Sequence, residues 1–366
     1  MNNKTIAVNL DNQVVWAGGS DGVSKYEPSN QWQVYKISDG LPDEEITSID
    51  IDNELIWLGT VKGGLSKGNK TTGAFENFTT ASGLSSNHIN AAAADTAYVW
   101  LITSDGISRY EKISGGIENF RYDVELLPYG GRGLALHSLI IDVDCIWFAG
   151  YGGLIRFDKA NSEFRRMELS DNHINAIAKD DQYVYLGTQQ GVTKYNKITR
   201  IFTEISQLHN VIVYSIDIDN DISWFGTEQG LYRYDTDVVR RFTTKDSGLL
   251  RDDVRVVAAK GGFVWCATYN GVCRYDVVND TWQSYTIKNG LPSNLIRDIA
   301  IDSQYAYFAT DHGMARIQTS GRLLYQESKG IDITIPNTTL TTNGDEDSFC
   351  SNNAPFLLHS DGNYRV

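Results

Sequence analysis

An aromatic residue inside a short apolar strand recurs at nearly constant spacing along the whole 366-residue chain. It is recognised in contexts such as IWLGT, IWFAG and YAYFAT, and the eight instances are Trp16, Trp57, Trp100, Trp147, Tyr185, Trp224, Trp265 and Tyr307. We call these residues the marker aromatics. The gaps between successive markers are 41, 43, 47, 38, 39, 41 and 42 residues. Such a period constrains the fold strongly, because each repeat unit must bury its apolar surface against the next.

The segments around each marker follow one pattern. A strand such as ITSIDI or INAIAK precedes the marker, and a Gly-containing turn with a second strand, such as GVSKYE or GLYRYD, follows it. A further strand with aromatics, such as FENFT or WQSYT, completes the unit. Four short strands in about 40 residues are typical of a β-propeller blade, and the alternation favours strands over helices. We therefore predict an all-β fold, a single β-propeller domain over residues 1–366 with structural, buried marker aromatics.

The number of blades depends on the C-terminal tail. Eight units are clear, and the tail after Lys329 keeps the same order of turns and strands, with Phe349 falling 42 residues after Tyr307. We therefore predict nine blades, the last a degenerate repeat at about 330–366. The alternative is eight blades with a capping tail. Since each unit is contiguous in sequence, ring closure is expected to rest on packing between the first and last blades.

The net charge of −14 argues against two classes of partner. An acidic surface repels phosphate backbones and anionic lipid, so we expect no nucleic-acid partner. We also expect no membrane insertion, because no run of 18 apolar residues exists. The N-terminal sequence MNNKTIAVNLDNQ shows no secretory signal pattern.

We predict no catalytic residue, no cofactor and no metal site. The sequence contains no H-E-x-x-H motif. Acidic pairs such as Asp50 with Asp52 and Asp217 with Asp219 could ligate calcium, but turn chemistry is the favoured interpretation. Cys266 and Cys273 flank one turn and are expected to be buried free thiols, with a cross-strand disulfide as the alternative.

A polar residue stands ten positions before seven of the markers, with an apolar residue one position earlier and another two positions later. These residues are Thr47, Asn90, His137, Asn175, Tyr214, Arg255 and Arg297. Their repeated place at the start of the inner strand predicts a ligand-recognition surface at the mouth of the central channel; the alternative is a solvated strand end. The same end is expected to gather the loop at 123–136 and the turn residues Asp105, Gln190, Glu228, Asn270 and His312.

Arg255 and Arg297 belong to neighbouring repeats. Two converging guanidinium groups repel each other unless an anion or an acidic side chain lies between them, and arginine matches carboxylates and sulfates well. The pair therefore points to a small acidic ligand such as an acidic sugar. The alternative is local neutralisation by Asp253 or Asp298 as exposed ion pairs.

The segments SWFGTEQGLYRYD and KNGLPSNLIRDIAID resemble the two-component regulator propeller repeat, and the likeness recurs along nearly the entire chain. The resemblance implies a sensor-type propeller that often responds to carbohydrates, and a periplasmic or extracellular location. The chain contains no kinase or regulator segment. An excised domain, a stand-alone binding protein and a component of an assembly therefore all remain open.

We conclude at this stage that the protein is a non-catalytic binding, sensor-type or scaffolding propeller, whose partners are a carbohydrate, another small molecule or a protein. One alternative is a propeller lyase acting on a saccharide or cyclic ester, with His312 as the base and Arg297 as the electrophilic group. A second alternative is a structural subunit of a larger assembly.

Overall fold

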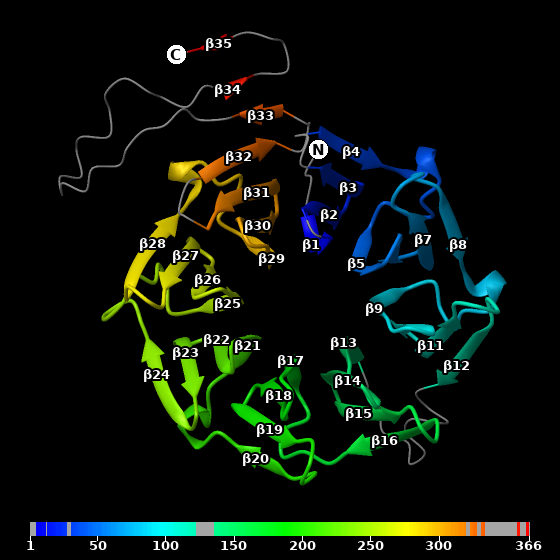
Figure 1. Cartoon of the computed structure of the whole chain (residues 1–366), viewed down its shortest axis with the longest axis horizontal. Coiled ribbons are helices and arrows are strands. Elements are labelled where there is room, and N and C mark those ends of the chain that lie inside the picture. The colour runs from blue at the N-terminus through cyan, green and yellow to red at the C-terminus, as the bar shows by residue number, and fades with distance from the viewer. Residues whose placement is uncertain are drawn as a thin grey trace.

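Eight antiparallel sheets surround a common centre in the computed structural model of the protein (Figure 1). The structure describes residues 5–11, 13–27, 31–121, 135–319, 323–327, 331–333, 357–358 and 364–365. Within each sheet the strands pair in chain order, so that every blade is built from contiguous sequence, as predicted. The first strand of each blade faces the centre and the fourth lies at the outer edge (Figure 1).

The first four blades span the N-terminal half of the ring. Blade 1 contains β1 (Thr5–Asp11), β2 (Val14–Gly19), β3 (Gly22–Glu27) and β4 (Gln31–Tyr35). Blade 2 contains β5 (Ile46–Asp52), β6 (Leu55–Thr60), β7 (Leu65–Asn69) and β8 (Phe75–Phe78). Blade 3 contains β9 (Ile89–Ala94), β10 (Tyr98–Thr103), β11 (Gly106–Glu111) and β12 (Ile117–Arg121). Blade 4 contains β13 (Ala135–Ile141), β14 (Cys145–Tyr151), β15 (Gly153–Asp158) and β16 (Glu163–Met167).

The remaining blades complete the ring. Blade 5 contains β17 (Ile174–Lys179), β18 (Tyr183–Thr188), β19 (Val192–Asn196) and β20 (Phe202–Glu204). Blade 6 contains β21 (Val213–Asp219), β22 (Ile222–Thr227), β23 (Gly230–Asp235) and β24 (Val238–Phe242). Blade 7 contains β25 (Val254–Lys260), β26 (Phe263–Thr268), β27 (Gly271–Asp276) and β28 (Thr281–Tyr285). Blade 8 contains β29 (Ile296–Ile301), β30 (Tyr305–Thr310), β31 (Gly313–Gln318), β32 (Leu323–Glu327) and a fifth strand, β33 (Ile331–Ile333).

Short 3-10 helices connect several blades, at η1 (Ile37–Asp39), η2 (Thr80–Ser82), η4 (Ser206–Leu208) and η5 (Ile287–Asn289). Two of them explain the repeated Gly-Leu-Pro sequence. Gly40 and Gly290 end η1 and η5 at φ values of 105° and 99°, a left-handed conformation that favours glycine. The leucines that follow, Leu41 and Leu291, are buried in the contacts between blades. The motif therefore turns the chain and fills an interface.

The marker aromatics form the core of the contacts between blades, as predicted from the sequence. All eight are at most 3% exposed. Each packs against the following blade: Trp57, for example, lies in a cluster with Leu101 and Tyr110 of blade 3. Eight such apolar clusters occur in the described part of the chain, and together they fill all eight blade-to-blade interfaces. Burying one large aromatic side chain contributes about 2–3 kcal/mol.

The ring closes after eight blades, so the prediction of nine blades is wrong. Tyr307 of blade 8 packs against Val8, Val15 and Tyr26 of blade 1, which leaves no open interface for another blade. Arg316 also crosses this seam: its guanidinium donates to the Tyr26 hydroxyl at 2.7 Å.

The tail from residue 330 is described only in short pieces. One of them, β33, pairs with β32 at the outer edge of blade 8. Another is a separate pair, β34 (Leu357–Leu358) and β35 (Tyr364–Arg365). Phe349, the basis of the ninth repeat, lies outside the described residues. The spacing between Tyr307 and Phe349 suggested a ninth blade wrongly, because spacing does not show whether a neighbouring blade still has a free face to pack against.

Several aspartates join one blade to the next. Asp50 and Asp217 lie within inner strands, rather than in turns as favoured from sequence, and accept the main-chain N–H of Ala94 and Ala259 in the next blade. Burial raises the pKa of both carboxyls. At the seam, Asp298 accepts the N–H of Val8 at 3.0 Å.

The two cysteines flanking the turn of blade 7 are free, as favoured. Cys266 and Cys273 are opposite each other in the pairing of β26 with β27, and both are buried. Burial raises the pKa of the Cys273 thiol to about 12, so it remains protonated and a poor nucleophile at neutral pH.

The Asp298 carboxyl at the seam makes a prediction about pH. Burial raises its pKa from 3.8 to about 6, so between these values the folded protein binds a proton that the unfolded chain does not. The contribution of this group to the free energy of unfolding is therefore full below pH 4 and is lost as the pH rises through 6. In Asp298→Asn this dependence disappears. From pH 4 to 7 we expect the stability of the variant relative to wild type to increase by about 2–3 kcal/mol, measured by urea denaturation.

Asp246→Asn is the control for this prediction. The main-chain N–H and side-chain hydroxyl of Thr243 both bond to Asp246, and these bonds lower the pKa of its carboxyl. Its contribution is therefore present above pH 4 and is lost as the pH falls below that value, so from pH 4 to 7 the difference between this variant and wild type should stay nearly constant. Parallel pH profiles for wild type and Asp298→Asn would contradict the role given to Asp298.

Candidate functional site

The seven polar residues predicted to form a binding surface all occupy β-bulges. Each inner strand has a register shift near its first residue, and the residue skipped by the pairing is the one ten positions before the marker: Ile6, Thr47, Asn90, His137, Asn175, Tyr214, Arg255 and Arg297. A bulge redirects a side chain and is common beside functional sites. It explains how a polar residue can directly follow a buried apolar one at the start of an inner strand.

Four of the seven side chains link their blade to the next. Each donates a hydrogen bond to the main-chain carbonyl of the first or second residue of the following inner strand. The pairs are Thr47 with Ile89 at 2.7 Å, Asn90 with Leu136 at 3.1 Å, His137 with Ile174 at 3.1 Å and Asn175 with Val213 at 2.9 Å. We call these four residues the staples. A polar group held in this way satisfies a buried carbonyl and stabilises the contact between blades.

His137 differs from the other staples because it also lies in an aromatic group. Its ring is 5.4 Å from that of Tyr151, which in turn is 5.9 Å from His173. Burial lowers the pKa of His137. The neutral ring therefore predominates at pH 7 and donates its Nε2 hydrogen to the Ile174 carbonyl.

The other three bulge residues, in blades 6, 7 and 8, form a different arrangement. The Arg255 guanidinium stacks on the Tyr214 ring at 3.8 Å, across the boundary between blades 6 and 7, and lies 5.0 Å from the Tyr269 ring. Asp253 holds Arg255 through an Nε–Oδ1 contact of 2.6 Å. Burial alone would lower the pKa of Arg255, but the Asp253 bond outweighs it and leaves the pKa raised. The arginine therefore stays charged in a fixed orientation.

Arg297 of blade 8 lies in the same region. It makes a two-pronged bond to Asp311, with nitrogen–oxygen distances of 2.7 and 3.0 Å, and its side chain remains 44% exposed. The hydrogen bond to Asp311 raises the pKa of Arg297 and outweighs partial burial, which lowers it; the charge of Asp311 and the nearby Tyr269 add to the increase. A third arginine, Arg251, lies 5.7 Å from the Tyr269 ring. We call Tyr214, Arg251, Arg255, Tyr269 and Arg297, with Asp253 and Asp311, the rim cluster.

The arginines of the rim cluster are only partly neutralised by ion pairs. The expected neutralisation of Arg255 by Asp253 is present, whereas Arg297 pairs with Asp311 and not with Asp298, which bonds to Val8. Arg251 has no ion-pair partner among the residues that the structure describes. The carboxylate of Glu228 also acts on Tyr214, so the feature that suits an anionic group is the set of guanidinium groups and not a net charge.

The turns between the second and third strands lie at the same end of the ring as the bulges. The N–H groups of Ser104, Glu228 and Asp311 bond to carbonyls of the residues that lead into the inner strands. This supports the prediction that turn residues such as Asp105, Asn270 and His312 gather there. Of the predicted loop at 123–136, residues 123–134 lie outside the described residues.

Sequence reasoning missed Arg251 and Tyr269. A signal for Tyr269 existed: it stands four residues after its marker, as Tyr151 does. Five of the other repeats carry a small or polar residue at this position, and Val61 is the exception. Tyr269 is 45% exposed, so its ring is accessible. No repeated sequence position points to Arg251, because it joins the cluster through its contact with Tyr269 in the turn between β26 and β27.

The described residues contain no group of three or more histidine, cysteine, aspartate or glutamate side chains placed to hold a metal ion. Within the same part of the chain, no helix reaches the length and apolarity required to cross a membrane.

Comparisons with known proteins identify the fold. No protein-family model and no curated protein sequence matches the chain. The crystal structure of the computationally designed Ika8 protein matches with a TM-score of 0.67 at 13% identity, over 86% of this chain and 96% of that one.

Two further similar structures are extracellular domains of putative hybrid two-component systems from B. thetaiotaomicron. BT4673 has a TM-score of 0.55 at 19% identity, over 88% of this chain and 52% of that one. BT3049 has a TM-score of 0.56 at 16% identity, over 89% and 53%. The chain thus spans about half the length of these two structures. The protein is an eight-bladed β-propeller whose structural neighbours include extracellular domains of putative two-component systems.

The staples and the rim cluster predict different effects on stability. Asn90→Ala or Asn175→Ala leaves a carbonyl between blades without its donor, so each should lower the free energy of unfolding by about 1 kcal/mol. Arg297→Ala removes an exposed ion pair and should cost less than about 1 kcal/mol. Urea denaturation of the three variants at pH 7 measures this. If Arg297→Ala lowers the free energy of unfolding more than the two asparagine variants do, Arg297 has a mainly structural role.

Proposed function

We propose that this protein is a non-catalytic, sensor-type recognition propeller that binds an acidic saccharide at the rim cluster. One observation carries the proposal. In blades 2 to 5 the bulge residue is a staple between blades, whereas in blades 6 to 8 the same position places a tyrosine and two arginines in one cluster.

The chemistry of the cluster matches such a ligand. The exposed ring of Tyr269 offers an apolar face on which a sugar ring can lie, and the guanidinium of Arg251 is beside it. Arginine forks bind carboxylate and sulfate groups with two parallel hydrogen bonds. Asp253 and Asp311 hold Arg255 and Arg297 in place before the ligand arrives, so less side-chain entropy is lost on binding.

The overall charge of the protein also favours the rim cluster as the binding place for an anion. The protein carries a net charge of −14, so an anion is repelled by most of its surface. The three arginines gathered in the rim cluster therefore favour one place for an anionic group. We also propose a periplasmic or extracellular location, supported by the extracellular domains among the structural neighbours.

Isothermal titration calorimetry with acidic oligosaccharides, carrying uronic acid or sulfate groups, tests the proposal. We expect one member of the panel to bind, with an affinity that falls as salt is added because ion pairs are screened. The double variant Arg255→Ala/Arg297→Ala should bind at least 10-fold more weakly, since each lost charged hydrogen bond contributes about 1.5–3 kcal/mol.

Arg240→Ala is the matched control. It removes another exposed arginine, paired with Asp280 at 3.3 Å at the outer edge of blade 6, and should leave the affinity unchanged. Full affinity in the double variant would exclude the rim cluster as the site. Turnover of a saccharide that disappears in His312→Ala would favour the lyase alternative. Binding of no saccharide, together with a stable protein partner on purification, would favour the scaffolding alternative.

A further inference from the structure

A cavity of about 840 Å³ lies between blades 1 and 2, at the other end of the ring from the rim cluster. Its lining includes Asp11 and Val14 from the turn between β1 and β2, and Asn53 and Glu54 from the matching turn between β5 and β6. The bulges lie at the start of the inner strands and these turns at their end, so the two sites are separated by the length of a strand. The volume is within the range of about 300–1,000 Å³ usual for small-molecule sites.

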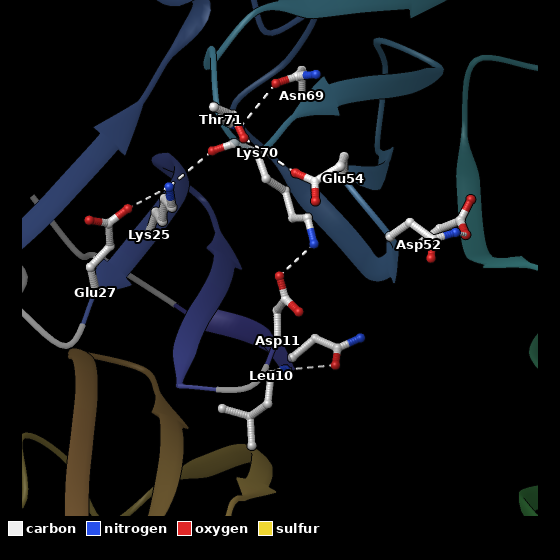
Figure 2. A network of polar contacts seen from close by, with 11 residues as sticks. Leu10, Asp11, Lys25, Glu27, Asp52, Glu54, Asn69, Lys70 and Thr71 are labelled. Atoms are coloured by element: carbon white, nitrogen blue, oxygen red, sulfur yellow. Dashed lines mark hydrogen bonds and ion pairs between the residues drawn. The ribbon is translucent and has the colours of Figure 1, made fainter.

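Two lysines line the cavity and are held in place by neighbouring groups (Figure 2). Lys25 contacts Glu27 at 2.6 Å and donates to the carbonyl of Lys70 at 3.0 Å. Lys70 contacts Asp11 at 2.5 Å. The two lysine side chains are only 12% and 11% exposed. Their ammonium groups are therefore fixed at the cavity, and the network crosses from one blade to the other.

The lysine at the position of Lys70 also links other pairs of blades. Lys112, Lys159 and Lys197 each reach a carboxylate of the preceding blade, at Asp52, Asp95 and Asp142. Each also donates to a main-chain carbonyl of its own blade. The acceptor is the residue directly after the inner strand: Asp95, Asp142 or Asp180. A lysine thus spans each of those three interfaces.

Blade 2 keeps the first of these contacts and lacks the second. Lys70 is the equivalent of Lys112, since the residues before them, Asn69 and Glu111, pair with the first residues of β6 and β10, and it reaches Asp11 of blade 1 in the same way. Among the described residues, its ammonium group donates to no main-chain carbonyl, whereas the carbonyl of Lys70 accepts a bond from Lys25 of blade 1. Lys70 therefore keeps hydrogen-bond donors for a ligand in the cavity.

An indole N–H without a partner also lines the cavity. Trp16 is 1% exposed, and its Nε1 makes no hydrogen bond. In blade 3 the equivalent Trp100 directs its Nε1 to Asp95, the residue five positions earlier, at 3.4 Å. Asp11 holds that position in blade 1 and lines the cavity, so the repeat directs the Trp16 N–H to the same place. The indole N–H groups of Trp57, Trp147 and Trp265 are likewise buried without a partner, so this donor is a feature of the repeat that a ligand could use at the cavity and does not by itself indicate one.

We infer that this cavity binds a small, neutral, polyhydroxylated molecule. An anion would meet four carboxylates there, from Asp11, Glu27, Asp50 and Glu54, and a cation would meet two ammonium groups. A hydroxyl is both donor and acceptor, so it can bond to an intact carboxylate–ammonium pair without breaking it. The inference is independent of the acidic ligand proposed for the rim cluster.

Saturation-transfer NMR and calorimetry with trehalose, cellobiose and myo-inositol test the inference, with spermidine and citrate as charged comparison probes. At least one neutral probe should bind the wild-type protein. Lys70→Met removes the ammonium group but keeps most of the side-chain volume, and should weaken that binding about 10- to 100-fold. Lys112→Met removes a lysine that also links two blades, with Asp52 as its partner, and should change the affinity less than about twofold.

Other variants keep the test decisive. If Lys70→Met does not fold, Glu54→Gln and Thr71→Val alter exposed residues of the lining and should each weaken binding several-fold. Arg255→Ala/Arg297→Ala should leave it unchanged, so that failure here is distinguishable from failure at the rim cluster. The inference is overturned if no neutral probe binds, if only spermidine or citrate binds, or if the lining variants keep full affinity.

Discussion

The burial of one flat aromatic side chain between each pair of sheets is the interaction on which the whole molecule depends. A single four-stranded sheet has two faces and too few residues to cover either, so it gains stability only from its neighbours. Most of the marker aromatics are among the largest fully buried side chains of the protein, and none is more than 3% exposed. Ring closure follows from the same requirement, since Tyr307 is buried only because blade 1 completes the eighth interface.

The bulge residue at the start of each inner strand has one of two roles: it links two blades, or it belongs to the cluster proposed to bind a ligand. A staple such as Asn175 uses its polar atom to satisfy a carbonyl of the next blade, which leaves that donor unavailable to a ligand. In blades 6 to 8 the same position holds larger side chains, and Arg255 contacts an aromatic ring and a carboxylate instead. The regular backbone permits this change because a bulge residue is already outside the strand pairing.

The two ends of the ring differ in their electrostatics. One end carries the rim cluster, where arginines outnumber carboxylates. At the other end, lysines and aspartates of successive blades form ion pairs such as Lys112 with Asp52 and Lys197 with Asp142. Burial alone would raise the pKa of Asp142, but its bonds to lysines outweigh this effect and leave the pKa lowered. Charge is therefore used at one end to join blades, and at the other it is left exposed.

The sequence by itself determined the repeat, the four-stranded unit, the buried markers and the position of the seven bulge residues, because these features recur with a fixed period. The blade number was decided by tertiary structure: spacing suggested a repeat around Phe349, but closure depends on whether Tyr307 meets blade 1. The separation of the seven bulge residues into staples and rim-cluster residues was likewise decided only by three-dimensional contacts. Asn90 and Arg255 hold the same place in the repeat, yet one bonds to a carbonyl and the other to Asp253 and Tyr214. A repeat pattern gives each residue its position along a strand, whereas its partners come from turns and neighbouring blades that the period does not record.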